Sequence, residues 1–196
     1  MLRVVFIRHS ITEGNKLKRY IGTTDEPLCF EGVNLLKERK YPGVEAIFTS
    51  PMLRCKETAG IIYNGMDYRI CQGFREINFG DFENKNYKEL DGNRDYQRWI
   101  DSNGKLPFPN GESQEEFAGR CMEEFDKVLD ICNDEGFKVI ALIVHGGTIM
   151  AILNELTKEV DYYKYMAKNG EGYIVDLDID KDGRIKSIHK ISPLFD

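Results

Sequence analysis

Two histidines and two arginines are the residues of this chain that best suit chemistry. His9 follows Arg8 at the end of the apolar stretch LRVVFIRH, and His145 follows the apolar part of FKVIALIVHGG. Arg54 comes a few residues after a third such stretch, VEAIFTS. Guanidinium forks bind phosphoryl oxygens bidentately, and they do so more specifically than a lysine. If these four side chains meet in the fold, the ligand that suits them best is a phosphate group.

The stretches that carry these residues predict how they meet. Short, continuous apolar runs rich in β-branched residues are typical of buried strands. We expect strands over LRVVFIRH, VEAIFTS and FKVIALIVHGG, and a weaker strand over DYRICQG. Ligand sites in open α/β sheets lie at the carboxyl ends of strands. Each residue alone has an ordinary explanation as a solvated strand end or a turn, but their convergence at one edge favours a functional site.

Helices are expected between these strands. Ser113 and Glu116 form a capping box, and Gly136 ends the apolar periodicity that follows. Pro51 suits the first turn of a helix that would carry Arg54. The four predicted helices are EGVNLLKERK, PMLRCKETAGIIY, SQEEFAGRCMEEFDKVLDICNDEG and GTIMAILNELT.

The alternation of strands and helices predicts an α/β fold. We expect a three-layer sandwich with a mostly parallel central sheet and helices on both faces. A single domain is expected over residues 1–196, with a small cap of short helices over about residues 79–112. The aromatic residues of the cap have two interpretations, because they could stack on a flat leaving group or form a small core of their own.

The C-terminal segment GYIVDLDIDKDGRIKSIHKI alternates like a β-hairpin with Asp182 and Gly183 in its turn. Asp178, Asp180 and Asp182 also match the spacing of an EF-hand calcium loop. Position twelve of that loop would be His189 instead of Glu, and the flanks alternate like strands. We therefore favour a hairpin that adds edge strands, and we assign no role to His189.

The composition argues against several classes of protein. A net charge of −6 without a basic stripe argues against nucleic acid as a partner. Five cysteines without CxxC or zinc spacing predict free thiols, a reducing compartment and no metal site. The apolar run before Arg8 is too short for a signal peptide or a membrane span. We expect a soluble cytoplasmic protein with no metal, cofactor or membrane partner; its oligomeric state stays open.

The stretch RHSITEGN resembles the RHGxTxxN signature of the histidine phosphatase (phosphoglycerate-mutase-like) superfamily. Further resemblances run from residue 3 to about residue 157. Any one of them is weak, but six in the family's order are specific. The other five stretches are YIGTTDEPLCFEG, TSPMLRCKETA, FREINFGDFE, PNGES and VIALIVHGGT.

The resemblance implies a role for each matching residue. His9 is implied to be the nucleophile that becomes a phosphohistidine, and Glu76 the general acid and base. Neighbouring arginines should keep the His9 imidazole neutral and nucleophilic. Glu76 must be protonated in the first step, so burial or the phosphate should raise its pKa. The phosphate pocket is implied to include Arg8, Arg54, His145 and Asn15, with weaker contacts from Thr12, Ile21, Gly22 and the Gly146 backbone.

Ser10 occupies the position where the family usually has glycine. We expect it to be tolerated, with its hydroxyl as a minor contact to a phosphate oxygen. It is not expected to be a nucleophile, because the chain lacks a GxSxG elbow. Ser10→Gly should therefore keep or raise activity.

The resemblance implies a metal-independent phosphomonoesterase that acts on a small-molecule phosphate ester through phosphohistidine. An α-ribazole phosphatase is a narrower alternative, because YIGTTDEPL and REINFGDFENKNYKEL are similar to those enzymes. A phosphoglycerate mutase is less favoured, since mutases of this type are usually longer and have an ERHYG-like segment where this chain has REINFG. A non-catalytic phosphate-binding protein is the fourth interpretation.

Overall fold

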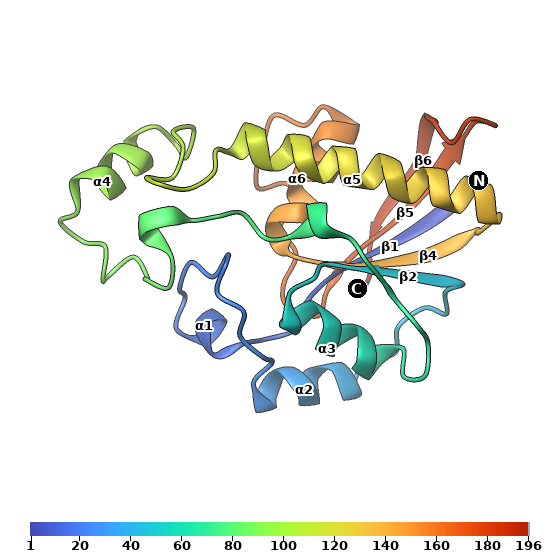
Figure 1. Cartoon of the computed structure of the whole chain (residues 1–196), viewed down its shortest axis with the longest axis horizontal. Coiled ribbons are helices and arrows are strands. Elements are labelled where there is room, and N and C mark those ends of the chain that lie inside the picture. The colour runs from blue at the N-terminus through green and yellow to red at the C-terminus, as the bar shows by residue number, and fades with distance from the viewer. Residues whose placement is uncertain (196) are drawn as a thin grey trace.

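A six-stranded sheet forms the centre of the computed structural model, which describes residues 1–195 (Figure 1). The strand order is β3-β2-β4-β1-β5-β6. The pairs β3–β2, β2–β4 and β4–β1 are parallel, whereas β5 pairs antiparallel with both β1 and β6. The prediction of a mostly parallel sheet is confirmed. The strands are β1 (Leu2–Arg8), β2 (Ala46–Thr49), β3 (Arg69–Ile70), β4 (Val139–Val144), β5 (Gly172–Ile179) and β6 (Ile185–Pro193).

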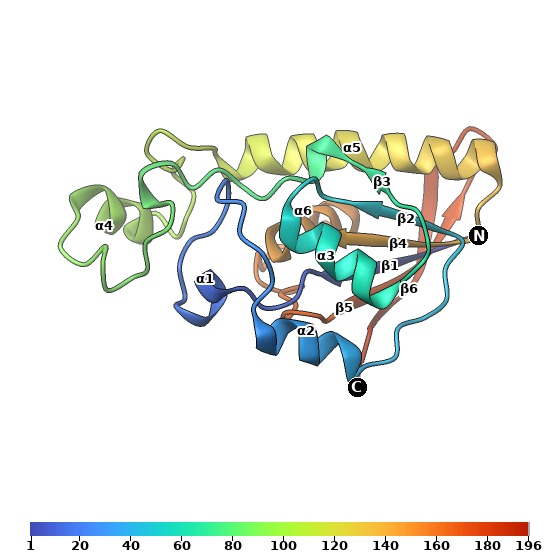
Figure 2. The same ribbon diagram turned by 60° about the horizontal axis from the view of Figure 1, so that its bottom comes forward.

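Helices cover both faces of the sheet (Figures 1 and 2). Helices α5 and α6 lie on one face, and α2 and α3 lie on the other. The predicted three-layer arrangement is therefore confirmed. The helices are α1 (Glu13–Lys16), α2 (Phe30–Lys37), α3 (Leu53–Ile62), α4 (Arg94–Asp101), α5 (Gln114–Glu135) and α6 (Gly146–Thr157), with 3-10 turns η1 (Gln72–Phe74) and η2 (Gly80–Phe82).

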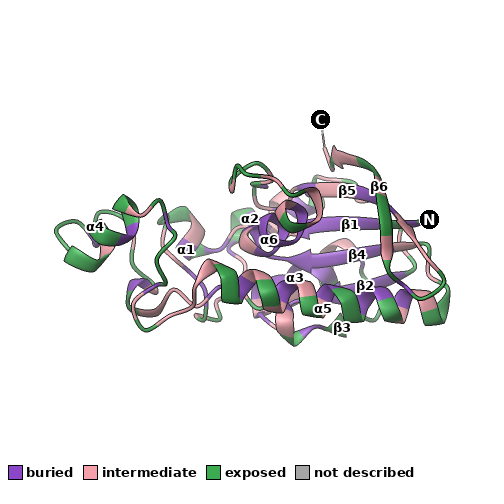
Figure 3. Ribbon diagram, turned by 90° about the horizontal axis from the view of Figure 1, so that it is seen from above, coloured by how far each residue is buried: buried purple, intermediate pink, exposed green. Residues whose placement is uncertain are grey.

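Strand β1 shows why its sequence is continuously apolar. Alternate side chains point to opposite faces of a strand. Val4 and Phe6 pack in the cluster that includes α5 and α6, whereas Val5 and Ile7 pack in the cluster that includes α3. Because a helix layer covers each face, neither set of side chains meets water, and the central strands are buried on both sides (Figure 3).

Two local predictions differ in their outcome. The capping box of Ser113 and Glu116 and the left-handed Gly136, with φ of 75°, bound α5 as expected. Pro51 instead lies before the helix, because α3 begins at Leu53. The N–H of Leu53 donates to Asp25 Oδ1 at 2.6 Å, so a carboxylate from a distant loop fixes this helix start.

The C-terminal hairpin is confirmed. Gly183 takes a φ of +79° in the turn between β5 and β6. Asp180 Oδ1 accepts hydrogen bonds from the backbone N–H groups of Asp182 and Arg184. The acidic series is therefore a turn between strands, and β6 forms the edge of the sheet.

Residues 79–112 lie largely beyond the end of the sheet and contain η2 and α4 (Figure 1). Phe82, Trp99 and Phe108 are buried there, and Phe82 is fully buried. These rings pack together, with 5.0 Å between the Trp99 and Phe108 centroids. These rings belong to the same hydrophobic cluster as the residues of α5 and α6, so they extend the main core and do not form a separate one. The division into one domain with a cap stays a prediction.

All five cysteines are free and buried. Within residues 1–195, no helix combines the length and the apolar character that crossing a membrane requires.

Candidate active site

The ends of β1 and β4 bring His9 and His145 together. These strands are parallel neighbours, and Arg8 pairs with Val144 in their register. The His9 N–H donates to the Val144 carbonyl at 2.8 Å. The two imidazole rings lie edge to face, with 5.2 Å between their centroids. The predicted convergence of the two histidines at one sheet edge is confirmed.

His9 is held as a neutral imidazole with one free nitrogen. Its Nδ1 lies 2.7 Å from the Ser10 carbonyl oxygen. A carbonyl only accepts hydrogen bonds, so Nδ1 carries the hydrogen and Nε2 keeps its lone pair. Burial, with Arg54 and Arg8 nearby, holds the pKa of His9 well below its usual value. The arrangement therefore presents Nε2 as a nucleophile.

His145 is positioned by Ser50, at the end of β2. Ser50 Oγ lies 2.7 Å from His145 Nε2 and accepts the N–H of Met52 at 3.4 Å. A hydroxyl has one hydrogen and two lone pairs, so Ser50 can donate to Nε2 or accept from it while it also accepts from Met52. Burial is the main cause that holds the pKa of His145 well below its usual value, with Arg54 next. The imidazole is therefore held neutral, and a hydrogen on its Nδ1 would face Glu76 Oε2, which lies 3.9 Å away.

Carbonyl oxygens hold two cations at the site, the buried Arg54 and the half-buried Arg8. Arg8 Nη1 donates to Ala167 O at 2.8 Å, and Arg54 Nη1 donates to Thr24 O at 2.8 Å. The Nε of each arginine is buried and has no hydrogen-bond partner among the described residues. Burial is the main cause that lowers the pKa of Arg8. Two desolvated cations with unused donors make a site that an anion would stabilise.

Glu76 lies close to His145 and to the N–H of the next residue, Ile77. Its Oε1 accepts the N–H of Ile77 at 3.0 Å, and its Oε2 lies 3.9 Å from His145 Nδ1. Burial raises the pKa of Glu76, whereas the Ile77 hydrogen bond, Arg54 and Arg8 oppose that shift. A raised pKa is what a carboxyl that must donate a proton requires.

Arg120 holds the loop that carries Glu76. Its guanidinium donates to the carbonyl oxygens of Gly73, Arg75 and Glu76 at 2.7, 2.7 and 3.1 Å. Glu112 binds the same guanidinium through both carboxylate oxygens, at 2.6 and 2.8 Å. Arg120 therefore joins α5 to the loop. No sequence pattern predicted this contact, because the two segments lie about 45 residues apart.

Asn15 and Thr12 have structural partners that orient them. Thr12 is the N-cap of α1, and its hydroxyl accepts the N–H of Asn15 at 3.2 Å. Asn15 Oδ1 accepts from the Thr12 N–H and from Asn169 Nδ2, at 3.2 and 3.0 Å. The oxygen of Asn15 is thus committed, and its amide nitrogen is the group it can offer a ligand.

Asn169 is a residue that sequence reasoning missed. Its Nδ2 also lies 3.1 Å from the His9 carbonyl oxygen and 3.3 Å from that of Ser10. It ties the loop before β5 to the loop after β1, across a separation in sequence that no local pattern reveals.

The backbones of Ile21 and Gly22 support Arg54. Their carbonyl oxygens accept from Arg54 Nη2 at 3.3 and 3.1 Å. The Gly22 N–H donates to Glu83 Oε1 at 2.9 Å, so a ligand would have to displace this bond. Gly146 starts α6 directly against Arg8, since a Cβ on it would lie 3.3 Å from Arg8 Nε. Ligand contacts by these three residues stay predictions.

Ser10 does not aim its hydroxyl hydrogen at a ligand. Its Oγ donates to the Gly32 carbonyl at 2.7 Å, and its N–H donates to Thr58 Oγ1 at 3.0 Å. Gly32 allows α2 to lie this close to the loop after β1, because a Cβ at this position would lie 2.2 Å from the Ile11 carbonyl oxygen. The expected contact between the Ser10 hydroxyl and a phosphate oxygen is therefore not what this geometry provides. The hydroxyl instead anchors the loop after β1 to α2.

Ser10→Ala is expected to lower the free energy of unfolding by about 1 kcal/mol, because it removes one buried hydrogen bond while Gly32 keeps its helical one. Its kcat/KM should stay within about threefold of the wild type, which is less than 1 kcal/mol of barrier. Urea unfolding and steady-state kinetics measure the two effects. Ser187→Ala, on exposed β6, is the matched control. A loss of activity as large as that of His9→Ala would contradict the anchoring role.

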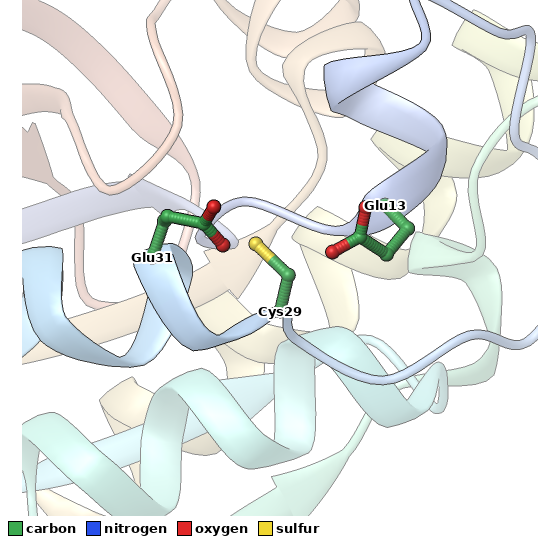
Figure 4. A group of neighbouring side chains, drawn as sticks. All are labelled: Glu13, Cys29 and Glu31. Carbon is green, nitrogen blue, oxygen red and sulfur yellow. The ribbon is translucent and has the colours of Figure 1, made fainter.

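One group of three or more His, Cys, Asp or Glu side chains within residues 1–195 has all its ligand atoms within 4.8 Å of one another. It consists of Glu13, Cys29 and Glu31 (Figure 4). The Lys16 ammonium already bonds Glu13 at 3.3 Å and Glu31 at 2.8 Å. Burial is the main cause that raises the pKa of the Cys29 thiol. Lys16 already pairs with both carboxylates, and we assign no metal to the group.

Comparisons with known proteins agree with this geometry. Residues 4–188 match the family model described as "Histidine phosphatase superfamily (branch 1)". "Probable phosphoglycerate mutase GpmB" of Escherichia coli O1:K1 / APEC is 30% identical over 156 residues, which are 74% of this chain and 70% of that protein. "Uncharacterized phosphatase PhoE" of Bacillus subtilis (strain 168) is 30% identical over 163 residues, 80% of this chain and 78% of that protein.

A solved structure shows the same fold. The alpha-ribazole phosphatase from Shigella flexneri superposes with a TM-score of 0.76 at 20% sequence identity. The alignment covers 90% of this chain and 91% of that one. At this identity the likeness concerns the fold, and it leaves the ligand to be argued from the site.

Proposed function

Because this chain belongs to the histidine phosphatase superfamily, we propose that it hydrolyses a small-molecule phosphate monoester, without a metal ion, through a phosphohistidine on His9. The observation that carries this proposal is a pair of arginines with unused, buried Nε donors beside a neutral imidazole. Arg8 and Arg54 each keep a buried Nε donor without a partner among the described residues. A phosphoryl group would pair both donors and offset both charges.

The first step transfers the phosphoryl group to His9. Nε2 attacks phosphorus, the bond from phosphorus to the ester oxygen breaks, and Glu76 gives its proton to that oxygen. The leaving group departs as the neutral alcohol. Arg8 and Arg54 stabilise the charge on the phosphoryl oxygens, which is most of what such a transfer requires.

The second step releases phosphate. Glu76, now a carboxylate, takes a proton from water as the water oxygen attacks phosphorus, and the bond from phosphorus to Nε2 breaks. One carboxyl thus serves as acid and then as base. In this proposal His145 carries its hydrogen on Nδ1 and donates toward the same region, and Asn15 offers its amide nitrogen.

The test is turnover of a chromogenic aryl phosphate in the presence of a chelator. We expect free phosphate at an unchanged rate after metal removal, and an acid-labile, base-stable phosphoenzyme on rapid quenching. A rate that falls with the chelator and returns with a divalent cation would contradict the metal-independent route. Phosphate binding without turnover of any ester would instead support a non-catalytic phosphate-binding protein.

The same assay separates the two narrower activities. With 3-phosphoglycerate, a mutase would form the 2-isomer, whereas a phosphatase would release phosphate. Including α-ribazole phosphate in the panel of esters shows whether that substrate is preferred.

A further inference from the structure

Two cavities meet at Glu76, and they differ in chemistry. The first, of about 170 Å³, is lined by Glu76 and Gln114 together with aromatic and apolar residues. The second, of about 570 Å³, is lined by Glu76 with charged and polar side chains. In the proposed reaction the alcohol that leaves must contact Glu76, because Glu76 protonates its oxygen. The leaving group therefore lies in one of these two cavities, and the inference below rests on the proposed function.

The smaller cavity has an aromatic wall. Six aromatic side chains line it, and Met150 and Ile77 add apolar surface. Trp99 and Phe108 are buried, whereas Tyr163 is 53% exposed at the rim. Neighbouring rings lie 5.0 to 5.2 Å apart, as between Phe79 and Phe108 and between Tyr20 and Phe79. The aromatic side chains are Tyr20, Phe79, Trp99, Phe108, Tyr162 and Tyr163.

The aromatic cavity offers an anion no counter-charge, because its donors are neutral groups: the Gln114 amide, the tyrosine hydroxyls and the Trp99 N–H. No lysine or arginine is among its lining residues within residues 1–195, and its one charged group is the Glu76 carboxyl. A carboxylate moved from water into such surroundings without a partner is strongly disfavoured. With no cation to pair with and the Glu76 carboxyl beside it, a leaving group that carries a carboxylate is disfavoured in this cavity relative to an uncharged one.

The polar cavity does not offer a carboxylate a free, buried cation either. Its Arg120 is already held by both oxygens of Glu112 and by three carbonyls. Glu112 and Glu116 line the same cavity and repel an anion. Arg75 lies there too, but it is exposed, where a single ion pair contributes little.

We propose that the aromatic cavity binds the leaving group, and that the substrate is the phosphate ester of an alcohol with a flat, uncharged aromatic ring. An apolar cavity of about 150 Å³ holds a benzene ring, so this cavity accommodates one ring or a small fused pair. Stacked and edge-to-face contacts with the wall favour such a ring beyond its simple burial.

The test compares esters whose alcohols have similar intrinsic reactivity. Benzyl phosphate, 2-naphthylmethyl phosphate, 4-carboxybenzyl phosphate and glycerol 2-phosphate are all alkyl esters, so leaving-group acidity does not decide the order. We expect kcat/KM for benzyl phosphate to exceed those for 4-carboxybenzyl phosphate and glycerol 2-phosphate by about tenfold or more, the size of one or two aromatic contacts.

Two variants assign that preference to the wall. Tyr163→Ala and Phe79→Leu should each lower kcat/KM for 2-naphthylmethyl phosphate by about 3- to 10-fold, mainly through KM, since each removes one aromatic contact. For glycerol 2-phosphate, kcat/KM should change less than twofold, which is a few tenths of a kcal/mol in the barrier. Tyr87→Ala is the matched control, because Tyr87 is also 53% exposed and lies outside the cavity.

Equal kcat/KM for benzyl and 4-carboxybenzyl phosphate would overturn the inference, as would a uniform loss across all esters in both variants. If no ester is hydrolysed, the proposed function fails while the cavity is still tested by calorimetry with benzylphosphonate and 4-carboxybenzylphosphonate. Tighter binding of the uncharged ligand, weakened by Tyr163→Ala, would support the aromatic site on its own. Equal binding of the two would reject it.

Discussion

His9→Ala is expected to lower kcat by about 10⁴-fold or more, because the nucleophile and the covalent route through it are lost together. The phosphoenzyme trapped by rapid quenching should disappear. Inorganic phosphate should still bind, since Arg8 and Arg54 keep their positions through carbonyl contacts on other segments. Calorimetry with phosphate and quench trapping with a radiolabelled ester measure the two results separately.

His189→Ala provides the control for this loss. His189 lies on β6 with its side chain 49% exposed, away from the strand ends that carry the site. Its rate and phosphoenzyme level should match the wild type. A phosphoenzyme that persists in His9→Ala would place the nucleophile elsewhere and reject the assignment.

Glu76→Gln is expected to have an effect that depends on the leaving group. The amide keeps an oxygen that can accept the Ile77 N–H, but it cannot give a proton. For an alkyl ester such as benzyl phosphate, kcat/KM should fall by about 10²- to 10⁴-fold, the usual contribution of a general acid. For 4-nitrophenyl phosphate the loss should be far smaller, because nitrophenolate leaves without protonation. Since kcat/KM covers only the steps up to phosphoryl transfer, a slow second step does not obscure this contrast.

The pH dependence of kcat/KM for the alkyl ester follows from the pKa shifts of Glu76 and His9. Burial raises the pKa of Glu76, so the acid form needed for the first step is lost only as pH rises through that raised value. Burial and the two arginines depress the pKa of His9, so the neutral nucleophile is lost only as pH falls through a value well below its usual one. The wild type should show an alkaline limb that Glu76→Gln lacks. Equal losses for both leaving groups, or an unchanged alkaline limb, would contradict the role of Glu76.

Local patterns in the sequence determined much of the frame. The capping box at Ser113, the left-handed Gly136 and the Asp182–Gly183 turn were predicted and confirmed, because each depends on residues a few positions apart. The convergence of His9 and His145 was also predictable. Continuous apolar runs indicate buried parallel strands, and the carboxyl ends of such strands meet at one edge.

The tertiary structure decided what the sequence could not. The anchoring of Ser10 to Gly32, the Ser50 bond to His145 and the Arg120 contacts to the loop before Glu76 each join segments far apart in the chain. The start of α3 likewise depends on Asp25 from a distant loop, which is why Pro51 proved a misleading signal.

The sequence by itself determined which residue types meet at the sheet edge, because apolar runs that mark buried strands, and the polar residues that end them, are short-range patterns. Only the tertiary structure decided which nitrogen of His9 is free, which donors of the arginines remain unused and what lines the two cavities at Glu76. Those properties depend on hydrogen-bond partners and desolvation, which exist only once distant segments pack together.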